Sequence, residues 1–462
     1  MQQQVKTNQK KKHTVRNVLL IILAVIIVAI PCKIIISNYI SSLPKLNYHF
    51  GNQSAKQVSY PDTQFAVISD THSYDNSLGT TGSAFEACLE SDRKLIKSTA
   101  ELMDFGVSRI ITQNPKFVLV TGDLTKDGEL LDHQQMASEL AKLRKKGIKV
   151  YVIPGNHDVN NPGAVRYDGN NAIPVTNISA SKFAEIYQDD GYGEALMRDP
   201  SSLSYVAQPQ EGLWIVGLDT CRYVENKKGE EETVGGRLTQ TEENWLEDVL
   251  TKAEAKGIAV IVMEHHGVVE HWKGQSKLHP DYLVSDYNYI GKLLSSYHVK
   301  LAFTGHYHAQ DISQGDFGQY GTLYDIETGS LATPPCPIRT CTISANKLTV
   351  SSEGIVGEIH AGTPFAKDGE AFVKKTIYNE AIKTLNNYFV TGTDANYIAN
   401  TVTSAFAAHY NGDENPANRS AFDQNKLNIW GRFVYSQEKY VIDGLWKDLP
   451  PADNNIVLDL SK

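Results

Sequence analysis

Six short apolar segments recur along this chain, and longer amphipathic stretches separate them. Each segment is a nearly continuous apolar run, as expected for a strand that is buried on both faces. The stretches 84–104, 132–146 and 240–256 carry acidic residues or a cap early and lysine late, which predicts helices. This alternation predicts an α/β sheet. The six apolar segments are residues 65–68, 117–120, 150–153, 214–218, 258–262 and 301–303.

The sequence pattern changes after residue 322. Segments 340–344 and 348–351 alternate apolar and polar residues around Asn346, which predicts a hairpin and, over residues 323–359, a second sheet. Beyond Gly362 the stretches 369–388, 394–410 and 435–446 predict helices. We therefore expect a linker at residues 37–61, a main domain at 62–362 and an all-helical C-terminal domain at 363–462.

The first 36 residues predict a transmembrane anchor. An apolar run at residues 18–36, interrupted by Pro31 and Lys33, follows a basic tail at residues 1–17. The run is close to the roughly 20 residues that span a bilayer. Because basic flanks stay in the cytoplasm, the chain from about residue 45 onward is expected outside it. A cleaved signal peptide and a secreted protein are the alternative. A lipoprotein at Cys32 is disfavoured because Pro31 stands where a small residue is required.

Composition excludes several classes of protein. With 41% apolar and 21% charged residues in a chain of 462, the sequence is not that of a disordered protein. After residue 45 there are 37 basic and 53 acidic residues, which disfavours duplex nucleic acid as a partner. Five cysteines are too few for a disulfide scaffold. Cys336 and Cys341 are close enough in sequence to form a bridge, and two free thiols are the equal alternative.

A short polar motif follows five of the six apolar segments. Each motif alone would also suit a turn or a surface pair. Ligands of open α/β sheets bind at the carboxyl ends of the strands, so we expect the five motifs to meet in one place. The motifs are Ser69-Asp70-Thr71-His72, Gly122-Asp123-Leu124, Gly155-Asn156-His157-Asp158, Glu264-His265-His266 and Gly305-His306-Tyr307-His308.

The side chains of these motifs suit transition metals. Mixed nitrogen and oxygen donors without thiolate favour Mn, Fe or Zn over Mg or Ca, which prefer oxygen. Seven donors exceed the needs of one tetrahedral ion and suit two metals about 3.5–4 Å apart that share a carboxylate. His157 is left to move a proton. The seven candidate metal ligands are Asp70, Asp123, Asn156, His72, His265, His306 and His308.

This ordered set of motifs resembles the calcineurin-like metallophosphoesterase family over residues 65–308. Within it, residues 122–129 resemble the class III cyclic-nucleotide phosphodiesterase branch. The resemblance implies two packed mixed β-sheets flanked by helices, an α/β/β/α sandwich. It implies that His157 contacts the phosphate and helps to protonate the leaving oxygen. It assigns one metal to Asp70, His72, Asp123 and His308, and the second to Asp123, Asn156, His265 and His306, with Asp123 bridging.

Several further residues carry weaker expectations. Purple acid phosphatases have a tyrosine three residues after the bridging aspartate, where this chain has Lys126, so we expect no tyrosinate-to-iron colour. The family pattern favours His265 over His266 as ligand, and leaves His266 to line the pocket or fill space. The loop 267–286 either shapes a substrate pocket or is solvated, and the solvated reading is the default. We expect the C-terminal aromatic residues to pack between helices rather than form a binding surface. These residues are, in the loop, His271, Trp272, His279 and Tyr282, and in the C-terminal segment Tyr378, Tyr388, Tyr397 and Trp430.

The resulting hypothesis is a dimetal phosphoesterase. A hydroxide held between the two metals attacks phosphorus in line, and His157 assists the leaving alkoxide. The expected partners are a small phosphate ester and the membrane; by family analogy the ester is a phosphodiester, with cyclic nucleotides as candidates. A phosphomonoesterase or nucleotide pyrophosphatase is the close alternative. A non-catalytic surface binding protein is the third, and it would hold no transition metal.

Overall fold

The computed structural model describes residues 49–51, 58–412 and 414–461. Residues Phe50–Lys462 form one compact unit. The predicted anchor at residues 18–36 and the basic tail before it lie outside the described residues. Within the described part, none of the helices combines the length and apolar character that a membrane span needs.

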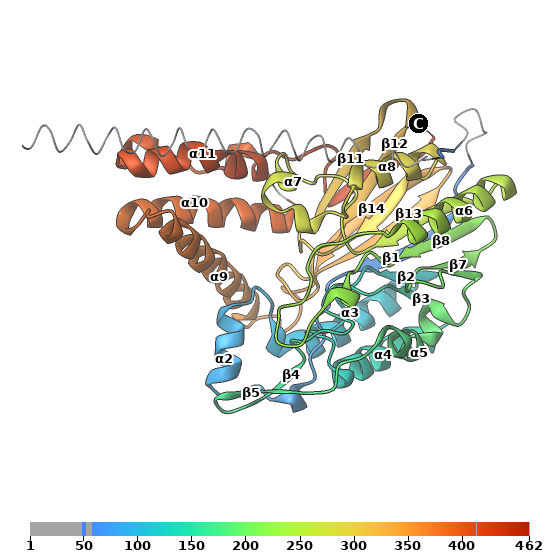
Figure 1. Cartoon of the computed structure of the whole chain (residues 1–462), viewed down its shortest axis with the longest axis horizontal. Coiled ribbons are helices and arrows are strands. Elements are labelled where there is room, and N and C mark those ends of the chain that lie inside the picture. Colours follow the sequence, from blue (N-terminus) through green and yellow to red (C-terminus); the bar gives the residue numbers. More distant parts are fainter. Residues whose placement is uncertain (1–48, 52–57, 413, 462) are drawn as a thin grey trace, which may run out of the picture. The chain divides into compact units, whose positions relative to one another are not determined.

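Two mixed sheets form the centre of the molecule (Figure 1). The first has the strand order β15-β14-β13-β1-β2-β3, in which β1, β2 and β3 are parallel. The parallel alignment brings the carboxyl ends of these three strands to one edge of the sheet. The strands are β1 (Thr63–Ile68), β2 (Phe117–Val120), β3 (Lys149–Val152), β13 (Pro337–Ser344), β14 (Lys347–Gly354) and β15 (Asn455–Asp459).

The second sheet has the order β11-β12-β10-β9-β8-β7-β6. Strands β8, β9, β10 and β12 are parallel, so their carboxyl ends also share one edge. A separate two-stranded ribbon joins β4 (Val165–Asp168) and β5 (Asn171–Pro174). The seven strands of the second sheet are β6 (Met197–Arg198), β7 (Tyr205–Gln210), β8 (Leu213–Leu218), β9 (Ala259–Glu264), β10 (Leu301–Thr304), β11 (Asp311–Asp316) and β12 (Thr322–Glu327).

The main hydrophobic core lies between the two sheets. Phe65 of β1 meets Phe303 of β10 edge to face at 5.3 Å between ring centroids and stacks on Phe117 of β2 at 4.9 Å. Helices cover the outer faces (Figure 1), as the α/β/β/α expectation requires. Helices α3 (Thr99–Gln113) and α4 (Leu130–Arg144) cover the first sheet, and α6 (Gln240–Lys256) and α8 (Tyr287–Ser296) cover the second. Shorter helices α2 (Ser83–Glu90), α5 (Ala180–Ile186) and α7 (Gln275–Leu278) lie in the connections.

The strands divide between the sheets differently from the sequence-based expectation. The six apolar segments do not form one sheet, because the first three belong to the first sheet and the last three to the second. The hairpin around Asn346 is present, with Ser344 paired to Lys347. It does not build the second sheet: β13 pairs antiparallel with the free edge of β1 and extends the first sheet. Strand β12, by contrast, joins the second sheet beside β10.

The helix expected at residues 84–104 is interrupted. Helix α2 ends at Glu90 and α3 begins at Thr99, so residues 91–98 form a loop that ends in a short 3-10 turn at Ile96–Ser98. Long-range hydrogen bonds hold this loop: the Leu95 backbone N–H donates to the Ala332 carbonyl at 2.7 Å, and Thr333 Oγ1 donates to the Arg93 carbonyl at 3.2 Å. In residues 91–98 these tertiary contacts override the local helix propensity.

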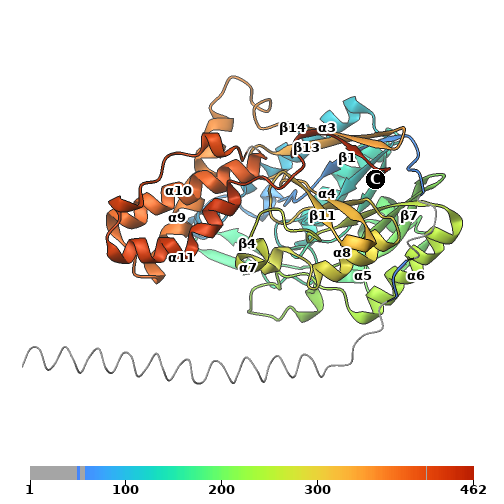
Figure 2. The ribbon, with the colours of Figure 1, turned by 90° about the horizontal axis from the view of Figure 1, so that it is seen from above.

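Three helices follow the sheets and gather at one end of the compact unit (Figures 1 and 2). They are α9 (Phe365–Asn387), α10 (Gly392–Asn411) and α11 (Ile429–Leu445). They share a core that includes Ile377, Ile398 and Leu445, and this core also takes in Tyr307 from the turn after β10. The chain then returns to the first sheet as β15, which pairs with β14.

Candidate metal centre

The five polar motifs converge at the carboxyl edges of the two sheets. Those with Asp70, Asp123 and Asn156 follow β1, β2 and β3, and those with His265 and His306 follow β9 and β10. A hydrogen bond joins the segments after β1 and β10: the backbone N–H of His306 donates to the Asp70 carboxylate at 3.0 Å. The site is therefore built from both sheets.

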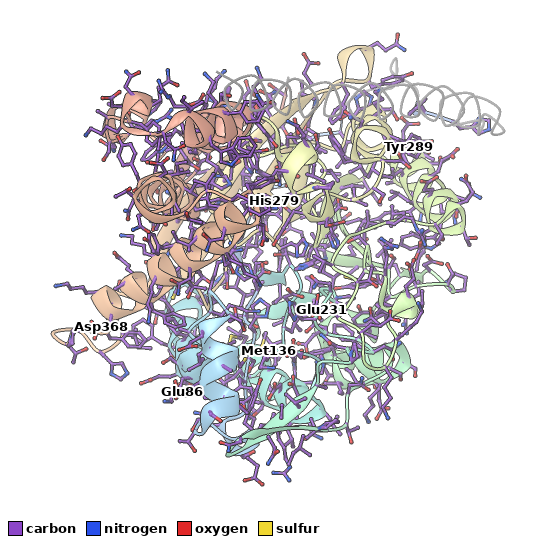
Figure 3. The ribbon with its side chains drawn as sticks, turned by 60° about the vertical axis from the view of Figure 1, so that its left-hand side comes forward. Glu86, Met136, Glu231, His279, Tyr289 and Asp368 are labelled. Atoms are coloured by element: carbon purple, nitrogen blue, oxygen red, sulfur yellow. The ribbon has the colours of Figure 1, made fainter. Side chains whose placement is uncertain are left out.

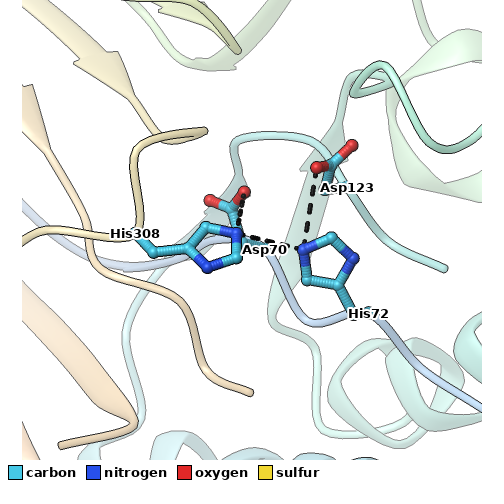
Figure 4. Close-up of side chains that lie close together, drawn as sticks. All are labelled: Asp70, His72, Asp123 and His308. Atoms are coloured by element: carbon cyan, nitrogen blue, oxygen red, sulfur yellow. Dashed lines mark hydrogen bonds and ion pairs between the residues drawn. The ribbon is translucent and has the colours of Figure 1, made fainter. Parts of the chain in front are cut away.

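A first cluster contains Asp70, His72, Asp123 and His308, whose ligand atoms all lie within 4.8 Å of one another. Nε2 of His72 lies 3.2 Å from Nε2 of His308 and 3.7 Å from Oδ2 of Asp123 (Figure 4). Nε2 of His308 lies 3.4 Å from Oδ1 of Asp70. The four side chains thus point their donor atoms at one common space.

A second cluster contains Asp123, His265 and His306. Nε2 of His265 lies 3.4 Å from Oδ2 of Asp123 and 3.2 Å from Oδ1 of Asn156. Nδ1 of His265 is 2.8 Å from the Thr121 carbonyl, to which it donates its proton, so its Nε2 is directed at the cluster. Asp123 belongs to both clusters, in the place expected for a bridging carboxylate.

The protonation of these groups fits cation binding. Burial lowers the pKa of His72 and of His306 well below the usual value, so both rings are neutral and have a lone pair to offer. Burial also lowers the pKa of His265, but Asp123 outweighs it and raises the pKa to about 9. A cation at the second cluster would displace that proton, as metal binding generally does. Buried carboxylates, an amide and imidazole nitrogens together match two divalent transition metals.

The backbone at the candidate ligands adopts an unfavourable conformation. Non-glycine residues rarely have positive φ, and such conformations cost on the order of 1 kcal/mol or more and gather at functional sites. Five of the seven candidate ligands have positive φ: Asp70 (49°), His72 (39°), Asp123 (49°), His306 (74°) and His308 (67°). The surrounding fold therefore holds these side chains against a local preference.

His157 lies beside the clusters and belongs to neither. Its Nδ1 is 2.9 Å from Oδ1 of Asp127, while its Nε2 is 4.0 Å from Oδ2 of Asp123. Burial lowers the pKa of His157, but Asp123 and the hydrogen bond to Asp127 outweigh it and raise the pKa to about 9. Lys126 forms an ion pair with Asp127 and lies 3.6 Å from Glu129. Asp127 thus holds His157, and Lys126 is engaged in an ion-pair group with Asp127 and Glu129.

A cavity of about 230 Å³ adjoins both clusters. Its walls include two cations, Arg93 and Lys94, that the sequence analysis missed. Both come from the loop 91–98 that interrupts the expected helix, and an adjacent Arg-Lys pair is too common in sequences to identify them. The side chain of Lys94 is nearly buried, and its ammonium group forms an ion pair with Asp92 at 3.3 Å within the cavity wall.

The loop after β9 is partly buried, whereas the default expectation was a solvated loop. Tyr282 packs against the ring of His306 at 4.5 Å between centroids and lines the cavity. His271 is buried, with Nδ1 2.5 Å from Oδ1 of Asp311. His266 lies outside both clusters: its Nδ1 is 2.7 Å from Thr220 Oγ1 and its Nε2 is 2.8 Å from a backbone carbonyl.

Comparison with known proteins identifies the family. A profile of calcineurin-like phosphoesterases matches residues 63–310. The chain belongs to this family. Membership implies a metal-dependent phosphoester hydrolase with a dinuclear centre.

Solved structures show similarity at low sequence identity. A dimetal phosphatase from Danio rerio is 18% identical, with 64% of this chain and 97% of that chain covered and a TM-score of 0.48. The purple acid phosphatase PPD1 from yellow lupin is 12% identical, with 64% and 53% covered and a TM-score of 0.35. A search of curated protein sequences finds no match to this chain.

Proposed function

We propose that this protein hydrolyses phosphodiesters at a dinuclear centre of Mn, Fe or Zn. The observation that carries the proposal is the position of Asp123, whose carboxylate takes part in two clusters of imidazole nitrogens and carboxylate oxygens. Bound there, the two metals supply Lewis-acid stabilisation of the phosphate and activation of water. The proposed ligands are Asp70, His72, Asp123 and His308 for one metal, and Asp123, Asn156, His265 and His306 for the other.

The residues around the clusters perform the remaining chemistry. Arg93 and Lys94 offset the negative charge of a bound phosphate. His157 gives the proton on Nε2 to the leaving oxygen, and Asp127 holds the opposite ring nitrogen so that Nε2 faces the cavity. The segment 122–129, which resembles the cyclic-nucleotide branch, supplies Asp127, and this supports cyclic nucleotides as candidate diesters.

The charge of the cavity wall supports a diester over a monoester. Asp92, Glu232 and Glu380 line the same cavity as the two cations. A phosphodiester carries one negative charge, whereas a monoester at neutral pH carries up to two. Asp92 and Glu380 are paired with Lys94 and Arg93, so this set of five side chains keeps one negative charge in excess, which repels a doubly charged monoester more strongly and disfavours the phosphomonoesterase alternative.

The test is a comparison of two chromogenic esters with the purified chain of residues 50–462. We expect bis(p-nitrophenyl) phosphate to be hydrolysed with at least tenfold higher kcat/KM than p-nitrophenyl phosphate, with two metals per chain. A preference for the monoester would support the alternative phosphatase function. A folded chain of residues 50–462 that binds no transition metal would support the non-catalytic alternative.

We also propose that residues 18–36 anchor the protein in the cell membrane with the catalytic domain on the extracytoplasmic side. The basic tail and the length of the apolar run support this orientation. Protease added to intact cells should degrade the catalytic domain, and the protein should stay with the membrane fraction. Recovery of a shortened chain in the medium would indicate signal cleavage and secretion instead.

A further inference from the structure

A second cavity of about 250 Å³ lies among the three C-terminal helices. Apolar side chains of α9, α10 and α11 make most of its wall, which also includes Arg93, His279, Glu380, Thr384 and Glu438. The burial of apolar side chains around open space is typical of a pocket for an apolar ligand. The principal apolar residues are Ile377, Leu385, Ile398, Val402, Phe406 and Val434.

This apolar cavity adjoins the metal cavity. Arg93 and Glu380, which form an ion pair at 3.0 Å, line both. Aromatic rings line the boundary: His279 and Phe406 belong to the apolar cavity and Tyr282 to the metal cavity, and His279 packs on Tyr282 at 5.5 Å and on Phe406 at 6.3 Å. Figure 3 shows His279 beside the C-terminal helices. Because candidate metal ligands line one cavity and apolar side chains line the other, a ligand that spans both would have its polar end at the candidate metal ligands.

An exposed apolar patch adjoins the apolar cavity at Tyr388. Tyr388 lines the cavity and is 47% exposed, and its carbonyl accepts a hydrogen bond of 2.8 Å from Trp430 Nε1. Trp430 is 48% exposed and stacks on Phe433 at 5.3 Å. Phe389 and Ile429, the chain neighbours of these residues, are 83% and 82% exposed. The expectation that the C-terminal aromatic residues pack between helices therefore holds for Tyr378 and Tyr397 but not for Tyr388 and Trp430.

We propose that the apolar cavity binds the alkyl chain of an amphiphilic phosphodiester whose phosphate lies in the metal cavity. The exposed patch contacts the lipid surface from which this ester is taken. Aromatic and aliphatic residues of this kind favour the boundary between water and lipid. The proposal rests on the proposed phosphodiesterase function and names the substrate class for the same site.

A series of alkyl p-nitrophenyl phosphates tests the cavity. Water replaces p-nitrophenolate at phosphorus, which leaves the alkyl phosphate, so colour reports each turnover. Each methylene that leaves water is worth up to about fourfold in affinity, so kcat/KM should rise by at least tenfold from the methyl to the octyl ester. Equal values for the two esters would overturn the proposal.

Matched tryptophan variants locate the effect. Ala381→Trp fills the apolar cavity and should bring the octyl-to-methyl ratio close to one. Ala371→Trp makes the same change at an exposed position of α9 and should keep the wild-type ratio. Methyl-ester turnover shows that a variant is folded; if Ala381→Trp has none, Val402→Phe takes its place. A wild-type ratio in a folded cavity variant would overturn the proposal.

Binding separates this inference from the proposed function. Octyl phosphate should bind to residues 50–462 at least tenfold more tightly than methyl phosphate in calorimetry, whether or not any diester is hydrolysed. If diesters are not hydrolysed but octyl phosphate binds in this way, the phosphodiesterase proposal fails and the alkyl site stands. Equal affinities overturn the alkyl site alone.

Vesicles test the exposed patch. The measured quantity is the ratio of the rate on octyl ester embedded in phosphatidylglycerol vesicles to the rate on the monomeric ester. We expect this ratio to fall at least fivefold in the double variant Phe389→Ser, Phe433→Ser. Val224 is 79% exposed elsewhere on the surface, and Val224→Ser should keep the wild-type ratio. An unchanged ratio in the double variant would show that the ester is taken from solution and would overturn the lipid-surface part.

Discussion

Replacement of His157 by alanine should slow hydrolysis in a way that depends on the leaving group. The ring lies outside both metal clusters, and its Nε2 faces the cavity while Asp127 holds Nδ1 at 2.9 Å. A p-nitrophenolate leaves without help, whereas an alkoxide needs a proton as it departs. The variant should therefore be impaired mainly with poor leaving groups.

The magnitude follows from the role of a positioned proton donor. Such a group contributes typically 10²–10⁴-fold, or about 3–5 kcal/mol of activation free energy. We expect kcat for a dialkyl phosphate or cyclic nucleotide to fall at least 100-fold in His157→Ala, and kcat for bis(p-nitrophenyl) phosphate to fall less than tenfold. Stopped assays of phosphate-ester products and a colorimetric assay measure the two rates at equal metal loading.

Two results would refute this reasoning. One is an equal loss with both classes of leaving group, which would assign His157 to phosphate binding alone. The other is a loss of metal in His157→Ala, because neither cluster contains this residue. Asp127→Asn is the matched positioning variant: it should reproduce the leaving-group dependence at smaller amplitude, about tenfold, since the ring stays in place but loses its charged partner.

Two further predictions concern packing and pH. A Cβ at Gly155 would lie 2.1 Å from Oδ1 of Asp123, so Gly155→Ala should lose at least tenfold in activity and part of its metal. The control Gly357→Ala, which has open space around it, should lose neither. Normal metal content in Gly155→Ala would contradict the prediction. Burial raises the pKa of the Asp190 carboxyl to about 7, and the ion pair with Arg144 offsets only part of the shift. Because the folded state binds this proton more tightly than the unfolded state, wild-type stability falls as pH rises from 5 to 8. Between pH 5 and pH 8, the free energy of unfolding of Asp190→Asn, measured in urea, should rise by about 2–3 kcal/mol relative to that of the wild type. A difference between the two proteins that does not change with pH would contradict this prediction.

Local signals in the sequence were sufficient for much of the fold. Helix α6 begins and ends at the expected residues because Thr239 and Glu242 form a capping box and Gly257 takes the left-handed conformation after the last turn. The convergence of the five motifs was also predictable, since each directly follows an apolar strand and parallel strands align their carboxyl ends.

Long-range features of the fold were not predictable in the same way. The partner of each strand depends on contacts between distant segments, so the addition of β13 to the edge of β1 has no local signal. The same holds for the loop 91–98, which contacts residues 332 and 333 and brings Arg93 and Lys94 to the site. The apolar cavity is a property of three packed helices, and the amphipathic pattern of each helix does not reveal the space left between them.

Metal content of Asp123→Ala, measured by inductively coupled plasma mass spectrometry beside the wild type, tests the shared-carboxylate centre most directly. Both candidate sites include Asp123, so the account predicts two transition-metal ions per wild-type chain and, in the variant, loss of both or at most one weakly held ion. Two tightly bound ions in a folded Asp123→Ala, or fewer than two in the wild type under saturating metal, would contradict it.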